Sequence, residues 1–116
     1  MKEKYVPMIC LDFDGVIHTY TGWKGNDPSA MDEPISGSQN AVREIQRLGY
    51  RVVIFTTRHR DAVLRWLERW GFPILEVTDV KPPFKVLLDD RAVQFRGEWN
   101  QEVIDGLHQF KAHWEN

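Results

Sequence analysis

Apolar and polar positions along the chain form short blocks that predict strands and helices in turn. Four apolar runs have the length and composition of buried strands, and they cover residues 7–13, 51–56, 74–77 and 86–88. A shorter run at residues 92–95 predicts an edge strand. Apolar residues recur at helical spacing in three segments, about residues 38–48, 61–70 and 101–110. Strands that alternate with helices are typical of α/β proteins, in which right-handed crossovers join parallel strands. The pattern therefore predicts a Rossmann-like α/β fold, a parallel sheet with helices on both faces.

Residues 16–37 interrupt this alternation. They are rich in Gly, Pro, Asp, Ser and Thr and show no sustained period, which predicts a long loop with room for a short hairpin. Loops of this length inside small domains are often functional, so we expect a flap beside a site. Trp23 and Lys24 lie between Gly22 and Gly25 at its expected tip. Trp23 either faces a phosphorylated substrate there, together with Lys24, or folds back onto the core.

The composition is that of one folded domain. The chain has 116 residues, 42% of them apolar, and no Pro/Gly/Ser-rich linker divides it, so we expect a single domain over residues 1–116. Its net charge of −2 gives no broad attraction to nucleic acid or to an anionic membrane, and no apolar stretch approaches the length of a membrane span. Cys10 is the only cysteine, which excludes an intramolecular disulfide and favours a reducing, cytoplasmic location. The composition is also compatible with a homo-oligomer.

Polar side chains that can carry chemistry follow the predicted strands. They are Asp12 and Asp14, Thr56, Lys81, and Asp89 and Asp90. The carboxyl ends of parallel strands meet at one edge of the sheet, where α/β proteins bind their ligands. Four carboxylates at that edge would repel one another strongly unless a cation lay among them. Because oxygen ligands alone favour Mg²⁺, the sequence predicts a magnesium site at this edge.

The order of these residues resembles a known family. The segments LDFDG, FTTR, VKPP and LLDDR are similar to the four ordered motifs of the haloacid dehalogenase superfamily, and they span residues 8–91. One such motif alone is weak evidence, whereas four in order, each after a predicted strand, are specific. The resemblance implies a Mg²⁺-dependent phosphohydrolase, a phosphatase that acts on a phosphomonoester through an aspartyl-phosphate intermediate.

The resemblance also implies a role for each motif residue. Asp12 is expected to attack phosphorus, and Asp14 to act first as general acid and then as general base while its backbone carbonyl binds the metal. Thr56 and Lys81 are expected to hold phosphoryl oxygens. The implied metal ligands are Asp12, Asp14, Asp90 and Asp89. Asp90 ranks above Asp89, because the second residue of this acidic pair often reaches the metal directly in similar proteins.

Residues next to the second motif extend the predicted site. Thr57 and Arg58 follow Thr56 and are candidates to bind the substrate phosphate. Arg91 flanks the site from the fourth motif. For both arginines, a salt bridge at the rim of the site is the competing interpretation.

Three further residues need an interpretation. Lys85 competes with Lys81 for the third motif, but Lys85 enters the fourth strand and so lies nearer the wrong end of the sheet. His18 and His59 come just after predicted strands and are interpreted as solvent-facing loop histidines.

Two other classes of protein stay open. A receiver domain of two-component signalling is also a small α/β protein with an acidic pair, a Thr and a Lys-Pro, although its order of motifs differs. A catalytically silent phosphate-binding module would share the fold without turnover.

Members of the superfamily usually select substrates with an inserted cap domain, for which this chain has no room. The predicted partner is therefore a phosphorylated substrate, and the sequence does not indicate its chemical class. The phosphatase half of polynucleotide kinases makes a nucleic-acid end one option, without support from the net charge.

Overall fold

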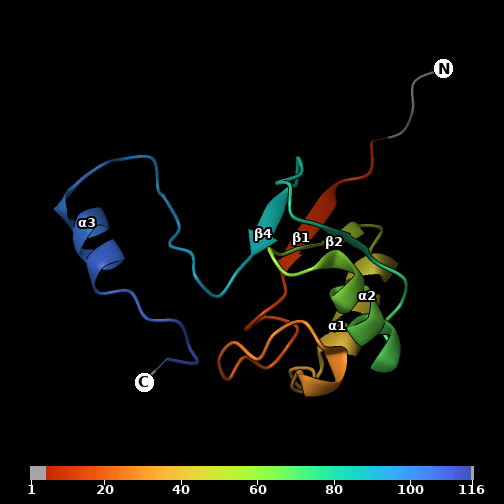
Figure 1. Ribbon diagram of the computed structural model, residues 1–116. Helices are drawn as coiled ribbons and strands as arrows, with labels where there is room; N and C mark the ends of the chain where they lie inside the picture. Colours follow the sequence, from red (N-terminus) through yellow and green to blue (C-terminus); the bar gives the residue numbers. More distant parts are fainter. Residues whose placement is uncertain (1–4, 116) are drawn as a thin grey trace.

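A computed structural model describes residues 5–115 and contains one four-stranded sheet in which every strand is parallel to its neighbours (Figure 1). The strands are β1 (Met8–Asp12), β2 (Arg51–Phe55), β3 (Glu76–Thr78) and β4 (Val86–Leu88), and their order across the sheet is β3-β2-β1-β4. The Rossmann-like α/β fold predicted from the sequence is therefore confirmed.

The register of the sheet brings the predicted motif residues to one edge. Asp12 lies opposite Phe55 on β2, and Leu11 lies opposite Leu88 on β4. Asp89 follows Leu88 and therefore lies level with Asp12, while Thr56 follows Phe55 and lies one position beyond it. The central position of β1 explains why its carboxyl end can meet side chains from both neighbouring strands.

Two helices pack on one face of this sheet. Helix α1 (Ser38–Arg47) and helix α2 (Arg60–Arg69) contribute Val42 and Trp66 to a core cluster that also holds Leu11 and Ile54. Both helices share this face because the chain moves in the same direction from β1 to β2 to β3, and right-handed crossovers then place each helix on the same side. Trp66 is fully buried in this cluster.

The prediction of helices on both faces of the sheet is wrong for the described residues, since α1 and α2 share one face and α3 does not contact the sheet. Residues 79–85 cross from β3 to β4 without a helix, and helix α3 (Gln101–His108) stands apart from the sheet (Figure 1). Its predicted apolar positions Ile104 and Leu107 are 52% and 55% exposed. The radius of gyration of 15.8 Å accordingly exceeds the value of about 13 Å expected for a compact chain of this length.

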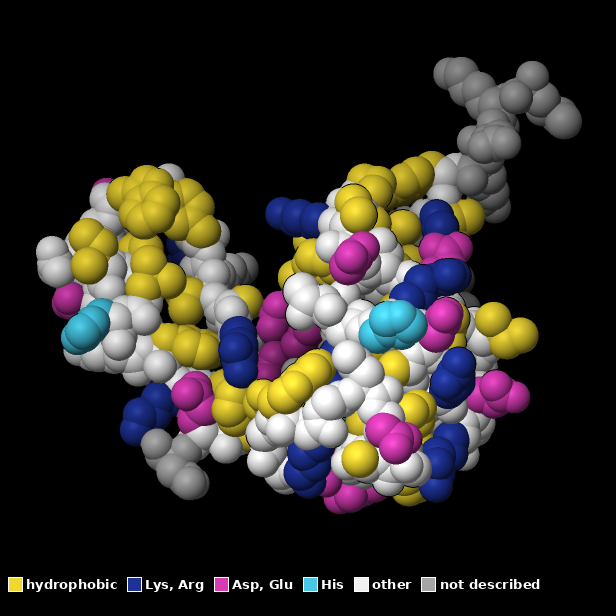
Figure 2. Space-filling model, in the orientation of Figure 1, with side chains coloured by type: hydrophobic (Ala, Val, Ile, Leu, Met, Phe, Trp, Pro, Cys, Tyr) yellow, Lys and Arg dark blue, Asp and Glu magenta, His cyan; other side chains and the backbone are white. Residues whose placement is uncertain are grey.

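The segment that leads to α3 also differs from the prediction. Residues 92–95 form no strand, so the predicted edge strand is wrong. Phe95 contacts Trp99 instead, with 5.3 Å between ring centroids, and both rings are largely exposed. Figure 2 shows apolar side chains gathered over this part of the molecule. Among the described residues, no helix has the length and hydropathy needed to cross a bilayer.

Residues 16–37 form the predicted long loop, which we call the flap. It contains a short 3₁₀ helix, η1 (Pro28–Ala30), and an isolated bridge between His18 and Pro34 in place of a hairpin. The indole nitrogen of Trp66 donates a hydrogen bond of 2.9 Å to the carbonyl of Asp32. The flap is thus fixed to α2 from beneath. Helix α1 begins after Gly37, and no side chain caps its first turn.

Candidate active site

One cavity of about 360 Å³ opens at the carboxyl edge of the sheet. Its walls come from the ends of β1, β2 and β4, from the flap and from the end of the chain. The lining residues are Asp12, Asp14, Tyr20, Trp23, Phe55, Thr56, Thr57, Arg58, Asp89, Asp90, Arg91 and Trp114. Every predicted site residue except Lys81 is in this set.

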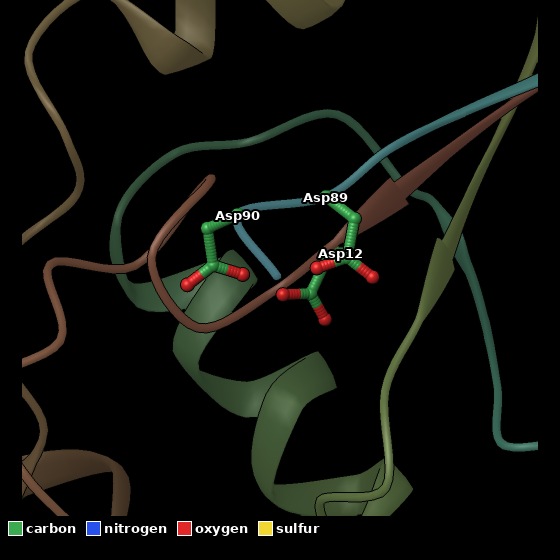
Figure 3. A group of neighbouring side chains, drawn as sticks. All are labelled: Asp12, Asp89 and Asp90. Carbon is green, nitrogen blue, oxygen red and sulfur yellow. The ribbon is translucent and has the colours of Figure 1, made fainter. Parts of the chain in front are cut away.

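Three carboxylates gather at the bottom of this site (Figure 3). One oxygen from each of Asp12, Asp89 and Asp90 lies within 4.8 Å of the other two. Burial, followed by the hydrogen bond to Asp90 and the charges of Asp89 and Asp90, raises the pKa of Asp12 to about 8. Burial also acts to raise the pKa of Asp90, but hydrogen bonds from Asp12 and Trp114 outweigh it and hold that pKa below its usual value. Without a cation, the crowded carboxylates therefore keep a proton on Asp12 near neutral pH.

The surroundings of Asp90 fit a metal ligand. Its Oδ2 accepts a hydrogen bond from the indole nitrogen of Trp114, whereas its Oδ1 is buried and has no hydrogen-bond partner. A buried carboxylate oxygen without a partner is costly, and a divalent cation shared with Asp12 and Asp89 would satisfy it. Asp12, Asp89 and Asp90 are the side chains that could hold Mg²⁺. The side chain of Asp14 lies outside this group.

Gly15 is required by the close approach of Asp90. Its φ of 82° is in the left-handed region, and a Cβ atom there would collide with the carboxylate of Asp90. The carbonyl of Gly15 also lies 2.7 Å from Nε2 of His113. The glycine of the first motif therefore allows the chain after β1 to turn directly beneath the acidic pair.

Asp14 lies outside the acidic cluster and forms a partly buried ion pair in the same cavity. Nε of Arg58 donates to both oxygens of Asp14, at 2.9 and 2.8 Å, and Nδ1 of His18 lies 2.8 Å from its Oδ1. Burial alone would raise the pKa of Asp14, but the hydrogen bonds from His18 and Arg58 and the charge of Arg58 lower it. Asp14 is therefore a carboxylate in this arrangement.

The side chains of His18 and Arg58 are both buried. His18 is 2% exposed because its ring stacks on Phe13 beneath the flap, so its interpretation as a solvent-facing histidine is wrong. Its Nε2 accepts a hydrogen bond from the backbone nitrogen of Asp32, which leaves Nδ1 as the protonated nitrogen that donates to Asp14. Arg58 is 5% exposed and lines the cavity, where it forms an ion pair with the partly buried Asp14.

The second and third motifs differ in how they meet the site. Thr56 lies in the cavity wall, with its Oγ1 accepting a hydrogen bond from the nitrogen of Arg58, and Thr57 lines the same wall. Lys81 does not line the cavity, and its ammonium lies 5.6 Å from the ring centroid of Phe84. Lys81 lies outside the cavity because the chain turns back after β3 toward the amino end of β4. Lys85 lies at that end, where its nitrogen bonds to the carbonyl of Met8.

Residues near the end of the chain contribute to the site without having been predicted. The ring of Trp114 contacts Tyr20, with 4.7 Å between centroids, and the guanidinium of Arg91 lies 4.8 Å from the centroid of Trp114. No spacing in the sequence indicated this contact, since more than twenty residues separate Trp114 from the fourth motif. Trp114 orients Asp90, and Tyr20 joins it to the flap.

Comparison with known proteins bears on the fold alone. No protein-family model matches the chain, and no curated protein matches it. A solved structure of a conserved protein from Bacteroides thetaiotaomicron is similar in fold, with a TM-score of 0.57 and 17% sequence identity over 90% of this chain and 91% of that one. This likeness extends over nearly the whole of both chains.

Proposed function

We propose that this protein is a magnesium-dependent phosphohydrolase, similar to those of the haloacid dehalogenase superfamily, and that Asp12 is its nucleophile. The observation that carries the proposal is the meeting of Asp12, Asp89 and Asp90 beside Thr56 in one cavity. A phosphoryl group needs a nucleophile, a cation to offset its charge and hydrogen-bond donors for its oxygens. This cavity offers residues for all three. The buried thiol of Cys10 suits the cytoplasm we propose as its location.

The proposed reaction has two steps at phosphorus. A carboxylate oxygen of Asp12 forms a bond to phosphorus while the bond from phosphorus to the ester oxygen breaks, and the alcohol leaves. Water then attacks the phosphorus of the aspartyl-phosphate, releasing inorganic phosphate and restoring Asp12. The hydroxyl of Thr56 can donate a hydrogen bond to a phosphoryl oxygen in both steps.

Asp14 is placed to move the protons of both steps. As a carboxylate paired with Arg58 and His18 it can accept a proton from the attacking water. To protonate the leaving alcohol it must first be protonated itself. A phosphate dianion bound beside it raises the pKa of Asp14, because a nearby like charge favours the neutral form.

Magnesium would be held by Asp12, Asp89 and Asp90. When bound, it supplies positive charge that offsets both the carboxylates and the incoming phosphate. The orphaned oxygen of Asp90 and the raised pKa of Asp12 support this assignment, since both are the marks of a site built around a cation.

A second candidate is a phosphate-binding module without turnover. It is favoured by the position of Lys81 outside the cavity and by the ion pair that occupies Asp14. Steady release of phosphate separates the two. We expect many turnovers with Mg²⁺ on at least one member of a panel of phosphomonoesters, whereas a binding module would show saturable binding and no release.

Magnesium should stabilise the protein, and more so at high pH. The pKa of Asp12 is higher in the folded state than in the unfolded state, so the unfolded state binds fewer protons between about pH 4 and 8. Stability of the metal-free protein therefore falls as pH rises through this window. Saturating Mg²⁺ should raise the thermal midpoint by roughly 10 °C at a hundredfold excess over its dissociation constant and should flatten the pH dependence.

Differential scanning calorimetry in EDTA or Mg²⁺ between pH 5 and 8 checks this prediction. Asp90→Asn removes one charge but keeps an oxygen for Trp114, and it should reduce the magnesium shift. Asp105→Asn is the matched control, because Asp105 lies on α3 and bonds to Gln101. Identical melting curves in EDTA and Mg²⁺ at pH 8 would contradict the metal assignment.

A further inference from the structure

The tip of the flap holds an exposed tryptophan in a fixed position. Trp23 is 61% exposed, lines the cavity and does not fold back onto the core. The guanidinium of Arg58 lies 4.5 Å from the centroid of its ring, so one face of the indole rests on a buried cation. Arg58 also donates a hydrogen bond of 2.7 Å to the carbonyl of Gly25, which ties the tip to the same side chain.

The other side of the tip is anchored as well. Lys24 donates to Asp32 at 3.0 Å, and the hydroxyl of Thr21 donates to the same carboxylate at 2.8 Å. Lys24 is thus paired inside the flap. A large apolar ring held rigidly in water has a cost that a monomeric fold does not need, whereas a rigid ring is well suited to binding because little freedom is lost with the ligand.

The charge beneath the ring restricts what the open face can bind. A cationic ligand would meet the positive field of Arg58 through the indole, so a neutral flat ring is favoured. The cavity that Trp23 shares with Asp12 measures about 360 Å³. This lies within the range of roughly 300–1,000 Å³ typical of sites that enclose whole small ligands, and exceeds what a phosphoryl group fills.

We infer that Trp23 is a stacking platform for the base of a nucleoside monophosphate whose phosphate reaches Asp12, an inference that rests on the proposed phosphohydrolase function. A purine or pyrimidine is flat and neutral, and stacking on an aromatic side chain is tolerant of which base is bound. A free mononucleotide fits better than a nucleic-acid end. The chain has a net charge of −2, and the two cations nearest the flap tip are paired with Asp14 and Asp32, which leaves them unsuited to further phosphates.

Steady-state kinetics on AMP and ribose 5-phosphate tests the inference, because ribose 5-phosphate carries a hydroxyl group at C1′ where AMP carries its base. The parent protein should show the higher kcat/KM for AMP. Trp23→Ala should lower kcat/KM for AMP by roughly 5- to 150-fold and change it much less for ribose 5-phosphate, and Trp23→Phe should restore most of the loss. Trp99→Ala is the matched control, since Trp99 is 73% exposed and does not line the cavity. Equal values for both esters in the parent, or equal losses in Trp23→Ala, would overturn the inference.

Binding keeps the inference testable if neither ester is hydrolysed, a result that would count against the proposed function alone. Calorimetric titration of the parent and Trp23→Ala proteins with AMP and ribose 5-phosphate in Mg²⁺ should show the same contrast in affinity. A 5′-phosphorylated oligonucleotide is then compared with AMP in both the kinetic and the binding experiments. AMP should be at least as good a ligand and substrate, and a clear preference for the oligonucleotide would overturn the assignment to a free nucleotide.

Discussion

Asp12→Asn should abolish phosphate release while the protein stays folded. The amide has nearly the volume of the carboxylate but cannot form the aspartyl-phosphate, so kcat should fall by at least about a thousandfold, as when other covalent nucleophiles are removed. The substitution also removes one of three crowded carboxylates. In EDTA at pH 8 the variant should therefore melt above the parent protein, because the cost of ionising Asp12 has gone.

The stability result distinguishes loss of chemistry from loss of fold. Circular dichroism and thermal midpoints of parent, Asp12→Asn and Asp105→Asn proteins provide the comparison, with Asp105 as an aspartate of α3 outside the cavity. Substantial turnover by a folded Asp12→Asn protein would rule out Asp12 as nucleophile.

Asp14→Asn should have the second largest effect, and the effect should depend on the leaving group. An alkyl alcohol needs a proton as it departs, whereas p-nitrophenolate leaves without one. Loss of the general acid should lower kcat/KM for an alkyl phosphate by about 10²- to 10⁴-fold and that for p-nitrophenyl phosphate far less. Equal losses on the two esters would show that Asp14 does not act as the acid.

This variant will also be less stable. Arg58 is buried, and removal of the charge of Asp14 leaves that cation without its partner, which should cost about 3–5 kcal/mol. The ratio of kcat/KM values for the two esters is measured in one preparation, so it does not depend on the fraction of folded protein.

The carboxyl edge of the sheet could be predicted because it depends on local pattern. Short apolar runs set the strands, with Asp12 at the end of β1 and with Thr56 and Asp89 directly after β2 and β4. Parallel register then brings these positions together without any information about side-chain packing. The cavity and its acidic cluster follow from that register.

Positions that depend on distant contacts could not be predicted. The sequence pattern predicts His18 in a loop, and only the packing of the flap over Phe13 buries its side chain. The sequence pattern predicts Lys81 just after a strand. Its position is set by residues 79–85, which connect β3 to β4 and have no periodic pattern. Trp114 reaches Asp90 from the end of the chain, after a helix whose apolar face the sheet does not cover. In each case the decisive partner lies in a different element.

A phosphoryl group carried by Asp12 can be trapped during turnover. The protein is mixed with a hydrolysed phosphomonoester and Mg²⁺, quenched in acid during turnover, and digested for mass spectrometry. We predict a phosphorylated peptide that contains Asp12, is sensitive to hydroxylamine as an acyl phosphate should be, and is missing in Asp12→Asn and in EDTA. Steady release of phosphate with no modified Asp12 at any quench time, and undiminished in Asp12→Asn, would rule out an aspartyl-phosphate at Asp12.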